Sequence, residues 1–173
     1  MDSHYHVRRA VPADLPHLPE IERCAARLFI DYGFSEDDLQ HVTSVEEHAQ
    51  AQQSGCLWIA ADQHEIPAAF IKVSSFDDFV HINEVDVHPD HQRRGLGAAL
   101  IEAVCAWAAS TGTRAVTLTT EREIPWNAPY YARLGFRIVP PEEQSPDLHI
   151  LFEHEAVLSN RSLENRVAMI REL

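Results

Sequence analysis

The sequence predicts an α/β (α+β) fold, in which helices flank a mixed central sheet of six to seven strands. Three observations support this prediction. Residues 57–61, 68–74 and 80–87 have strand-like patterns separated by polar turns, which is typical of an antiparallel meander. The next segment places six apolar side chains on one face of a helix: Leu96, Ala99, Leu100, Ala103, Val104 and Trp107. A buried strand at residues 115–119 follows directly.

The other elements follow from local patterns. Residues 6–10 are a predicted strand, and a helix begins at Pro12, with Leu15, Leu18, Ile21, Ala25 and Leu28 at helical spacing. A polar helix is predicted over residues 35–53, beginning at Ser35. The remaining predicted elements are helices at 127–134 and 146–158 and strands at 136–139 and 166–173, the last with a helix as the alternative.

Length and composition predict one domain spanning residues 1–173. The chain has 173 residues, of which 45% are hydrophobic, enough for one core. It contains no apolar run of 18 residues, so we expect no membrane span. The first ten residues lack the apolar region of a secretory signal, which favours a cytoplasmic protein.

Charge and histidine content limit the classes of partner. A net charge of −13 argues against sequence-independent nucleic-acid binding, which needs a basic face. It favours cationic substrates weakly, but a role of the negative charge in solubility is the better explanation. The eleven histidines are scattered, and neither close pair (His4/His6, His88/His91) has a cysteine nearby, so no metal site is predicted. The sequence leaves open whether the chain forms a homodimer.

Residues 85–98 are the most informative segment for function. A strand leads into a loop, and Gly95 and Gly97 lie where the amphipathic helix begins. Small residues there let an anion approach the free N–H groups of the helix, whose dipole favours negative charge. Arg93 and Arg94 add cationic donors. The segment therefore predicts a phosphate or pyrophosphate site that is neither a Walker loop nor a three-glycine dinucleotide loop.

Two motifs resemble those of the GNAT family of N-acetyltransferases. The spacing Gln92-x-x-Gly95-x-Gly97 is similar to the acetyl-CoA signature of that family. Residues 125–136 look like its second half-site, a helix that ends in Tyr131-x-x-x-Gly135-Phe136. The order of predicted elements over residues 6–139 also resembles the family's fold, whereas residues 140–173, a predicted helix and last strand, are poorly diagnostic.

The resemblance implies acetyl transfer from acetyl-CoA, without a metal, to a primary amine of a small molecule or peptide by direct attack. It implies that the pantetheine arm lies in a V-shaped opening between the fourth and fifth strands. Main-chain groups of Val85, Asp86 and Val87 would then face the pantetheine. The pyrophosphate would be wrapped by Gln92, Arg93, Arg94, Gly95, Leu96, Gly97 and Ala98. Asn127 is a further candidate for cofactor contact or an N-cap, and Ile124 stands where the family commonly has an Asn.

The resemblance also implies an acid and a base. Tyr131 corresponds to the family's tyrosine acid, with Tyr130 as the alternative and core packing as the structural explanation. Family members often carry a base on the strand at 80–87, where alternation places His81 on one face and Glu84 on the other. His81 titrates in a useful range, and Glu84 competes if a bulge turns the strand. Both residues could instead be purely structural.

Two other functions fit the same motifs. A non-catalytic module that senses acyl-CoA would keep the loop, but Tyr131 argues against it. An enzyme with another acyl donor or a hydroxyl acceptor would keep every motif. Turnover of acetyl-CoA with defined amines distinguishes these alternatives.

Overall fold

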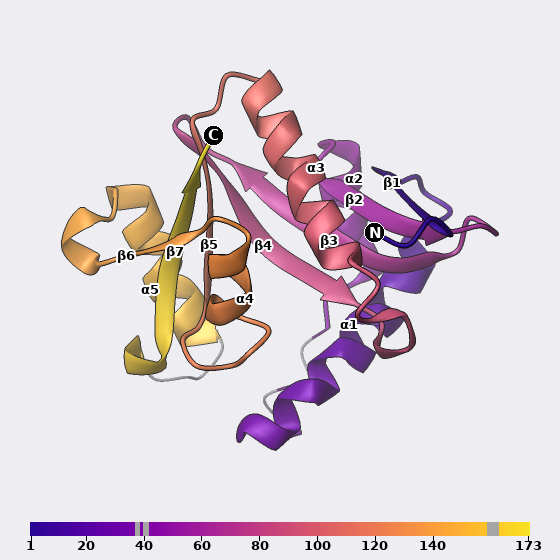
Figure 1. Ribbon diagram of the computed structural model, residues 1–173, viewed down its shortest axis with the longest axis horizontal. Coiled ribbons are helices and arrows are strands. Elements are labelled where there is room, and N and C mark those ends of the chain that lie inside the picture. The colour runs from indigo at the N-terminus through magenta and orange to yellow at the C-terminus, as the bar shows by residue number, and fades with distance from the viewer. Residues whose placement is uncertain (37–38, 40–41, 159–162) are drawn as a thin grey trace. The chain divides into compact units, whose positions relative to one another are not determined.

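The strands form the predicted mixed sheet, in the order β1-β2-β3-β4-β5-β7-β6 (Figure 1). The computed structural model describes residues 1–36, 39, 42–158 and 163–173. Its strands are β1 (Tyr5–Arg9), β2 (Leu57–Asp62), β3 (Pro67–Ser75), β4 (Phe79–Val87), β5 (Ala115–Glu121), β6 (Arg137–Val139) and β7 (Arg166–Glu172). Its helices are α1 (Leu18–Ala26), α2 (Val45–Gln53), α3 (Leu96–Ser110), α4 (Ala128–Arg133) and α5 (Pro146–Leu158).

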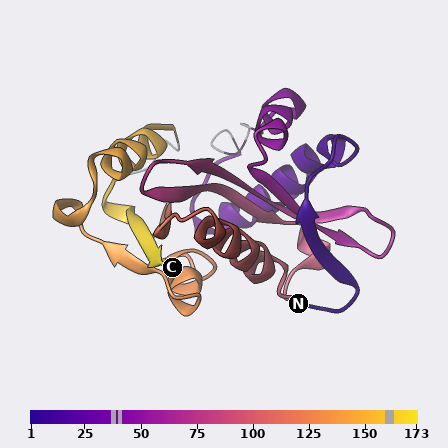
Figure 2. The same cartoon turned by 90° about the horizontal axis from the view of Figure 1, so that it is seen from above.

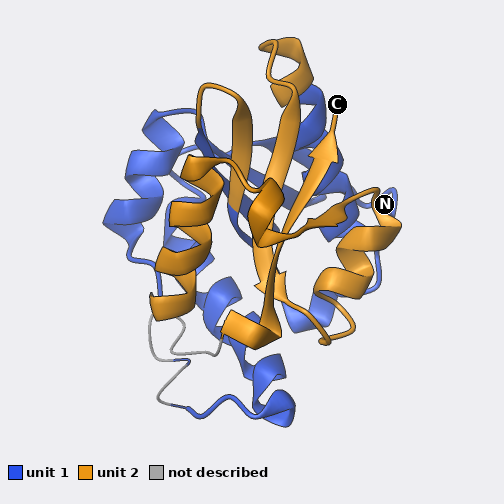
Figure 3. Cartoon of the chain, turned by 90° about the vertical axis from the view of Figure 1, so that its left-hand side faces the viewer, with its two compact units in different colours: residues 1–75, 83–107 blue, residues 76–82, 108–173 orange. Residues whose placement is uncertain are grey.

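The chain divides into two compact units (Figure 3). Unit 1 comprises residues 1–75 and 83–107, and unit 2 comprises residues 76–82 and 108–173. Strand β4 therefore contributes its first half to unit 2 and its second half to unit 1. The single domain over 1–173 stays a prediction.

In unit 1, helices cover both faces of the antiparallel strands β1, β2 and β3. Leu57 and Ile59 of β2 are buried in a cluster with Leu18 and Ile21 of α1, against which residues of α2 also pack. Trp58, between them on the opposite face, contacts Trp107 of α3 with ring centroids 5.0 Å apart. Figure 2 shows α1 and α2 on one side of these strands and α3 on the other. Burial on both faces explains why β2 is almost wholly apolar.

In unit 2, β5 is the central strand. It pairs in parallel with residues 79–82 of β4 and antiparallel with β7, which pairs in turn with β6. The apolar side chains of α5, Leu148 and Phe152, pack with Phe79, Ala115 and Ala168 from these strands. The last segment is thus a strand rather than the alternative helix, because β7 has pairing partners on both sides.

Two helix starts differ from the prediction. The helix predicted from Pro12 begins as a 3-10 turn at Leu15–His17, becomes α1 at Leu18 and ends at Ala26. The helix predicted over 35–53 begins only at Val45, and residues 37, 38, 40 and 41 lie outside the described part of the chain. Ser44, not Ser35, is its N-cap.

A capping box explains where α2 begins. The Glu47 N–H donates to Ser44 Oγ at 3.2 Å, and the Ser44 N–H donates to Glu47 Oε2 at 2.9 Å. These two bonds satisfy two backbone N–H groups that the start of a helix leaves unpaired. A serine without a partner glutamate three residues later, as predicted at Ser35, would satisfy at most one.

Ser44→Ala is therefore expected to lower the free energy of unfolding by about 1 kcal/mol, the usual cost of losing an N-cap. Urea denaturation measures this change. Ser3→Ala, at an exposed serine outside the helices and strands, serves as the control and should stay within about 0.5 kcal/mol of the wild type. The reverse order of the two effects would contradict the assignment.

None of the helices in the described ranges has the length and apolar character that crossing a bilayer requires.

Candidate active site

The predicted phosphate loop joins β4 to α3 in unit 1. After β4 ends at Val87, a 3-10 turn spans Pro89–His91, and α3 begins at Leu96. Arg93 and Gly95 have φ values of +58° and +78°, in the left-handed region. At Gly95 a Cβ would also approach the Met1 nitrogen to 3.1 Å. A glycine is therefore required where the chain turns into the helix.

The start of α3 fits an anion. The first bond within this helical turn runs from the Ala99 N–H to the Gly95 carbonyl at 3.1 Å, so the preceding N–H groups have no acceptor within the helix. The positive end of the helix dipole lies there, and it favours a negatively charged group. The seven predicted residues, 92–98, run without a break from the end of the 3-10 turn into the first turn of α3.

The N-terminal residues lie against the same loop. The Asp2 N–H donates to the Arg94 carbonyl at 2.9 Å, and the Asp2 carboxylate lies 3.8 Å from the Arg94 guanidinium. The Tyr5 hydroxyl is 2.7 Å from His91 Nδ1. Strand β1 thus supports the loop on the side of Arg94 and His91.

Glu84 belongs to a group of polar side chains contributed by α1, β3, β4 and the residues before α2. Its carboxylate lies 2.8 Å from Lys72 Nζ, and Lys72 also donates to Thr43 Oγ1 at 3.0 Å. The Thr43 N–H donates to Glu22 Oε2 at 2.9 Å. Asp86, two residues along β4, shares the face of Glu84 and interacts with both glutamates. We call Glu22, Glu84 and Asp86 the carboxyl cluster.

Two members of the carboxyl cluster, Glu22 and Asp86, have raised pKa values. Burial, helped by the negative charge of Glu84, raises the pKa of Glu22 from 4.5 to about 7, although the Thr43 N–H opposes this shift. Burial and the charges of Glu84 and Glu22 raise the pKa of Asp86 well above its ordinary value. Three carboxyl groups thus share one lysine, and Glu22 and Asp86 keep their protons to higher pH than isolated carboxyl groups do.

His48 lies beside this cluster as a buried, uncharged ring. It has no exposed surface, and neither ring nitrogen has a hydrogen-bond partner among the described residues. Its ring packs edge-on against Phe70 with centroids 5.2 Å apart. Burial lowers the pKa of His48, so the imidazole stays neutral and adds no positive charge to offset the carboxylates.

His81, the other candidate base, is part of a different network, in unit 2. It is fully buried, with Nδ1 2.8 Å from Thr117 Oγ1 and Nε2 3.2 Å from Glu155 Oε1. Thr119 Oγ1 donates to the other Glu155 oxygen and accepts from Arg166 at 2.6 Å. Although burial alone would raise the pKa of Glu155, bonds from His81 and Thr119 and the Arg166 charge hold it low. These contacts tie α5 to β4, β5 and β7 and favour a structural role for His81.

Tyr131 and Asn127 lie in and next to α4, also in unit 2. The Tyr131 ring is buried and meets Tyr130 and Phe136 edge-on, with centroids 5.5 and 6.0 Å apart. Gly135 has a φ of +87°, as predicted for the residue that ends the helix. Asn127 is at the N-cap, but its side chain makes no capping hydrogen bond. An N-cap role therefore does not account for its amide.

Several of these features were not predicted. Glu22, Thr43 and Lys72 were missed because they belong to three elements far apart in the sequence. Glu155 and Arg166 were missed for the same reason. Within the described ranges, no group of three or more His, Cys, Asp or Glu side chains could hold a metal ion.

Solved structures with the same fold include N-acetyltransferases. N-acetylglutamate synthase from Neisseria gonorrhoeae, complexed with coenzyme A and N-acetyl-glutamate, matches with a TM-score of 0.73 at 16% identity. That match covers 100% of this chain and 36% of the synthase, so the chain spans about a third of its length. PaiA N-acetyltransferase from Thermoplasma acidophilum, in complex with coenzyme A, matches with a TM-score of 0.72 at 13% identity over 98% and 99% of the two chains. The ribosomal-protein-S18-alanine N-acetyltransferase from Escherichia coli gives 0.65 at 20% identity over 97% and 93%.

A family model adds sequence evidence to the shared fold. The model described as "Acetyltransferase (GNAT) family" matches residues 19–136, which is more than half of the chain. The matched range contains the phosphate loop, the carboxyl cluster and Tyr131. This chain is therefore a member of the GNAT acetyltransferase family.

Proposed function

We propose that this protein transfers the acetyl group of acetyl-CoA to a primary amine of a small molecule or peptide. The observation that supports this most directly is the loop of residues 92–98, which turns at Gly95 into the anion-binding end of α3. Two structural neighbours are named for acetylation of an amino group, on glutamate and on an alanine of a ribosomal protein. The carboxyl cluster, in the same unit as the loop, suits an amine acceptor.

Binding of the cosubstrate rests on backbone groups. The N–H groups at the start of α3 and the side chains of Arg93 and Arg94 hold the pyrophosphate. Main-chain groups of Val85, Asp86 and Val87 hydrogen-bond the pantetheine amides, and the Asn127 amide adds a contact. Because backbone donors carry most of this binding, the loop conformation matters more than its side chains.

Acetyl-CoA supplies a thioester whose carbonyl carbon accepts the amine. The neutral amine nitrogen forms the new C–N bond, the C–S bond breaks, and the products are an amide and a free thiol. An amine with a pKa of about 10.4 must first lose a proton, which Glu84 accepts. Tyr131 donates a proton to the departing sulfur, and the Val85 N–H stabilises the negative charge on the carbonyl oxygen.

Glu84 is favoured over His81 as the base by its surroundings. Both ring nitrogens of His81 are engaged and the ring has no exposed surface. Glu84 is partly exposed, and its neighbour in the carboxyl cluster, Glu22, has a pKa raised to about 7. The cluster can therefore take up a proton near the working pH, which suits general base catalysis.

The value of kcat/KM is expected to rise as the pH increases through about 7, the pKa of Glu22, because the carboxyl cluster then loses a proton. Glu84→Gln should lower the plateau by about 10²-fold or more. His81→Ala should keep the ascending limb, although it should destabilise unit 2. Two amines of different pKa separate this limb from deprotonation of the substrate.

A folded His81→Ala protein that loses the limb, while Glu84→Gln keeps full activity, would identify His81 as the base instead. If both variants keep full activity and the wild-type profile, no residue of β4 accepts the proton. Solvent would then take it, and the enzyme would act by positioning and by stabilising the oxyanion.

A turnover screen tests the function itself. Release of thiol from acetyl-CoA is measured with polyamines, amino acids, aminoglycosides and lysine peptides, and calorimetry measures binding of CoA in parallel. We expect tight CoA binding and amine-dependent thiol release. CoA binding without turnover on any amine would instead support a sensor of acyl-CoA.

A further inference from the structure

The residues before β1, 1–4, form a turn that lies against the phosphate loop. Asp2 is the centre of this turn, because its carbonyl accepts the Tyr5 N–H at 3.2 Å and its Oδ1 accepts the His4 N–H at 3.1 Å. The Asp2 N–H donates in turn to the Arg94 carbonyl at 2.9 Å. Three hydrogen bonds therefore hold the Asp2 carboxylate in place beside the loop.

The Asp2 carboxylate lies next to one of the two arginines of the loop. Its Oδ2 is 3.8 Å from Arg94 Nη1, and the Asp2 and Arg94 side chains are 33% and 44% exposed. Arg94 also donates to the Asp90 carbonyl at 3.4 Å, which keeps its guanidinium on the loop. Within the described part of the chain, Arg93 makes no ion pair or side-chain hydrogen bond. Of the two arginines, Arg94 is therefore the one that already has an anionic partner.

The pair between Asp2 and Arg94 is weak enough to be exchanged for another anion. Its distance of 3.8 Å exceeds the usual length of a charge-assisted hydrogen bond, about 2.7–2.9 Å, and exposed ion pairs contribute little to stability. A pyrophosphate at the start of α3 carries more negative charge, and it also meets the free N–H groups and the helix dipole. It would therefore replace the carboxylate at Arg94, at a cost in binding affinity equal to the worth of the lost pair.

We propose that Asp2 is an internal competitor of the cosubstrate. In the free protein its carboxylate pairs with Arg94, and the pyrophosphate of acetyl-CoA or CoA takes its place on binding. This inference rests on the proposed function, which puts the pyrophosphate at this loop. The competition weakens the binding of acetyl-CoA and of the product CoA alike. A lower affinity for CoA shortens the time that the product stays bound, and product release limits the rate of many enzymes.

Asp2→Asn tests the proposal, because it removes the charge and keeps an oxygen that can accept the His4 N–H. We expect the variant to bind CoA about three- to fivefold more tightly, which is close to the full worth of an exposed ion pair. Calorimetry at low ionic strength measures the Kd, since salt screens such a pair. Pantetheine, which carries no phosphate, should bind the variant and the wild type equally well. Thermal unfolding shows whether the variant is folded.

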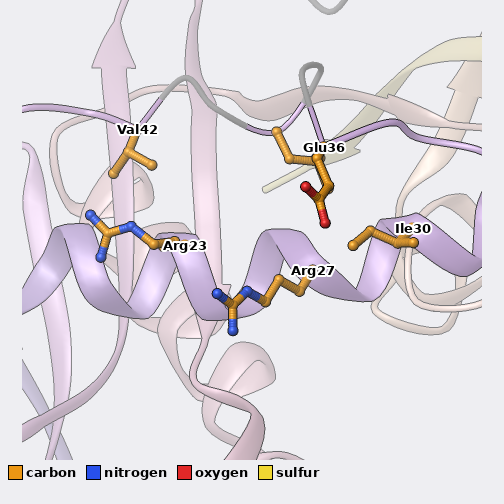
Figure 4. A pocket seen from close by; sticks show the side chains of 6 residues that line it. Arg23, Arg27, Ile30, Glu36 and Val42 are labelled. Atoms are coloured by element: carbon orange, nitrogen blue, oxygen red, sulfur yellow. The ribbon is translucent and has the colours of Figure 1, made fainter.

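Glu20→Gln is the matched control for the loss of one negative charge. It removes a carboxylate from a second exposed arginine pair of unit 1, that of Glu20 with Arg23 on α1. Figure 4 shows the surroundings of Arg23, a hollow along α1 to which the loop, described throughout, contributes no residue. This variant should keep the Kd for CoA within about 1.5-fold of the wild-type value, because distant exposed charges are screened.

Two arginine backgrounds show whether the competition takes place at Arg94. Arg94→Ala and Arg93→Ala should each weaken CoA binding, because each removes a cationic donor. In Arg94→Ala, which lacks the proposed contact, adding Asp2→Asn should change the Kd by less than about 1.5-fold. In Arg93→Ala, which keeps the contact, the gain of about three- to fivefold should remain.

Three results would overturn the inference and leave the proposed function standing. The first is unchanged or weaker CoA binding by folded Asp2→Asn. The second is an equal gain with pantetheine. The third is a gain that persists in full in Arg94→Ala, which would mean that Asp2 only repels the pyrophosphate from a distance. Absence of CoA binding by the wild-type protein would instead reject the proposed function.

Discussion

Tyr131→Phe is expected to lower kcat by about 10²- to 10⁴-fold, the usual contribution of a positioned proton donor. The substitution removes one hydroxyl and keeps the ring, whose edge-on contacts with Tyr130 and Phe136 hold it in the buried face of α4. Packing should therefore survive while the thiolate loses its acid. The measurement is steady-state thiol release with an identified amine, supported by thermal unfolding of the variant.

Tyr130→Phe is the matched control for this effect. The two tyrosines are adjacent on α4, and burial raises the pKa of Tyr130, which weakens it as a proton donor. Its variant should keep kcat within about threefold of the wild type. If Tyr131→Phe also stays within that range, Tyr131 is not the acid, and a large loss in Tyr130→Phe would transfer the role to its neighbour.

Gly95→Val should raise the Kd for CoA by at least about a hundredfold. The left-handed φ of +78° disfavours any side chain, and a Cβ would come within 3.2 Å of both the nitrogen and the Cα of Met1. The turn must then move, and the N–H groups at the start of α3 lose their alignment with the pyrophosphate. Two such bonds to a charged group are worth about 1.5–3 kcal/mol each, which corresponds to the stated change.

Gly112→Val controls for the general cost of a side chain at a left-handed glycine. Gly112 has a φ of +85°, and no atom lies within 4 Å of the point that a Cβ would occupy, so its variant carries backbone strain without a steric contact. Calorimetry with CoA and thermal unfolding are measured on both proteins. Unchanged CoA affinity in a folded Gly95→Val protein would remove the basis for placing the pyrophosphate at this loop.

The turn between β4 and α3 and most elements of the fold could be predicted because their signals are local. The helical spacing of Leu96, Leu100 and Val104 marks α3, and Gly95 just before it marks the turn into this helix. Such features depend on residues within a few positions of one another, where backbone geometry and side-chain periodicity act directly. The capping box at Ser44 is equally local, but a longer polar run obscured it.

The choice between Glu84 and His81 shows where local reasoning stops. Strand alternation places the two side chains on opposite faces of β4, which the pattern alone establishes. What each face meets depends on residues more than 30 positions away: Thr117 and Glu155 for His81, and Thr43 for Glu84. Only these contacts decide which carboxyl or imidazole is free to exchange a proton.

From the sequence by itself came the fold class, the order of elements and the predicted anion-binding turn, since each depends on periodicity or short spacing. The candidate tyrosine acid came from the resemblance to the GNAT family. Tertiary structure alone decided the carboxyl cluster and the pKa of about 7 at Glu22. The physical reason is that burial and charge–charge interaction depend on distance in space. Chain packing sets that distance for residues as far apart in the sequence as Glu22 and Glu84.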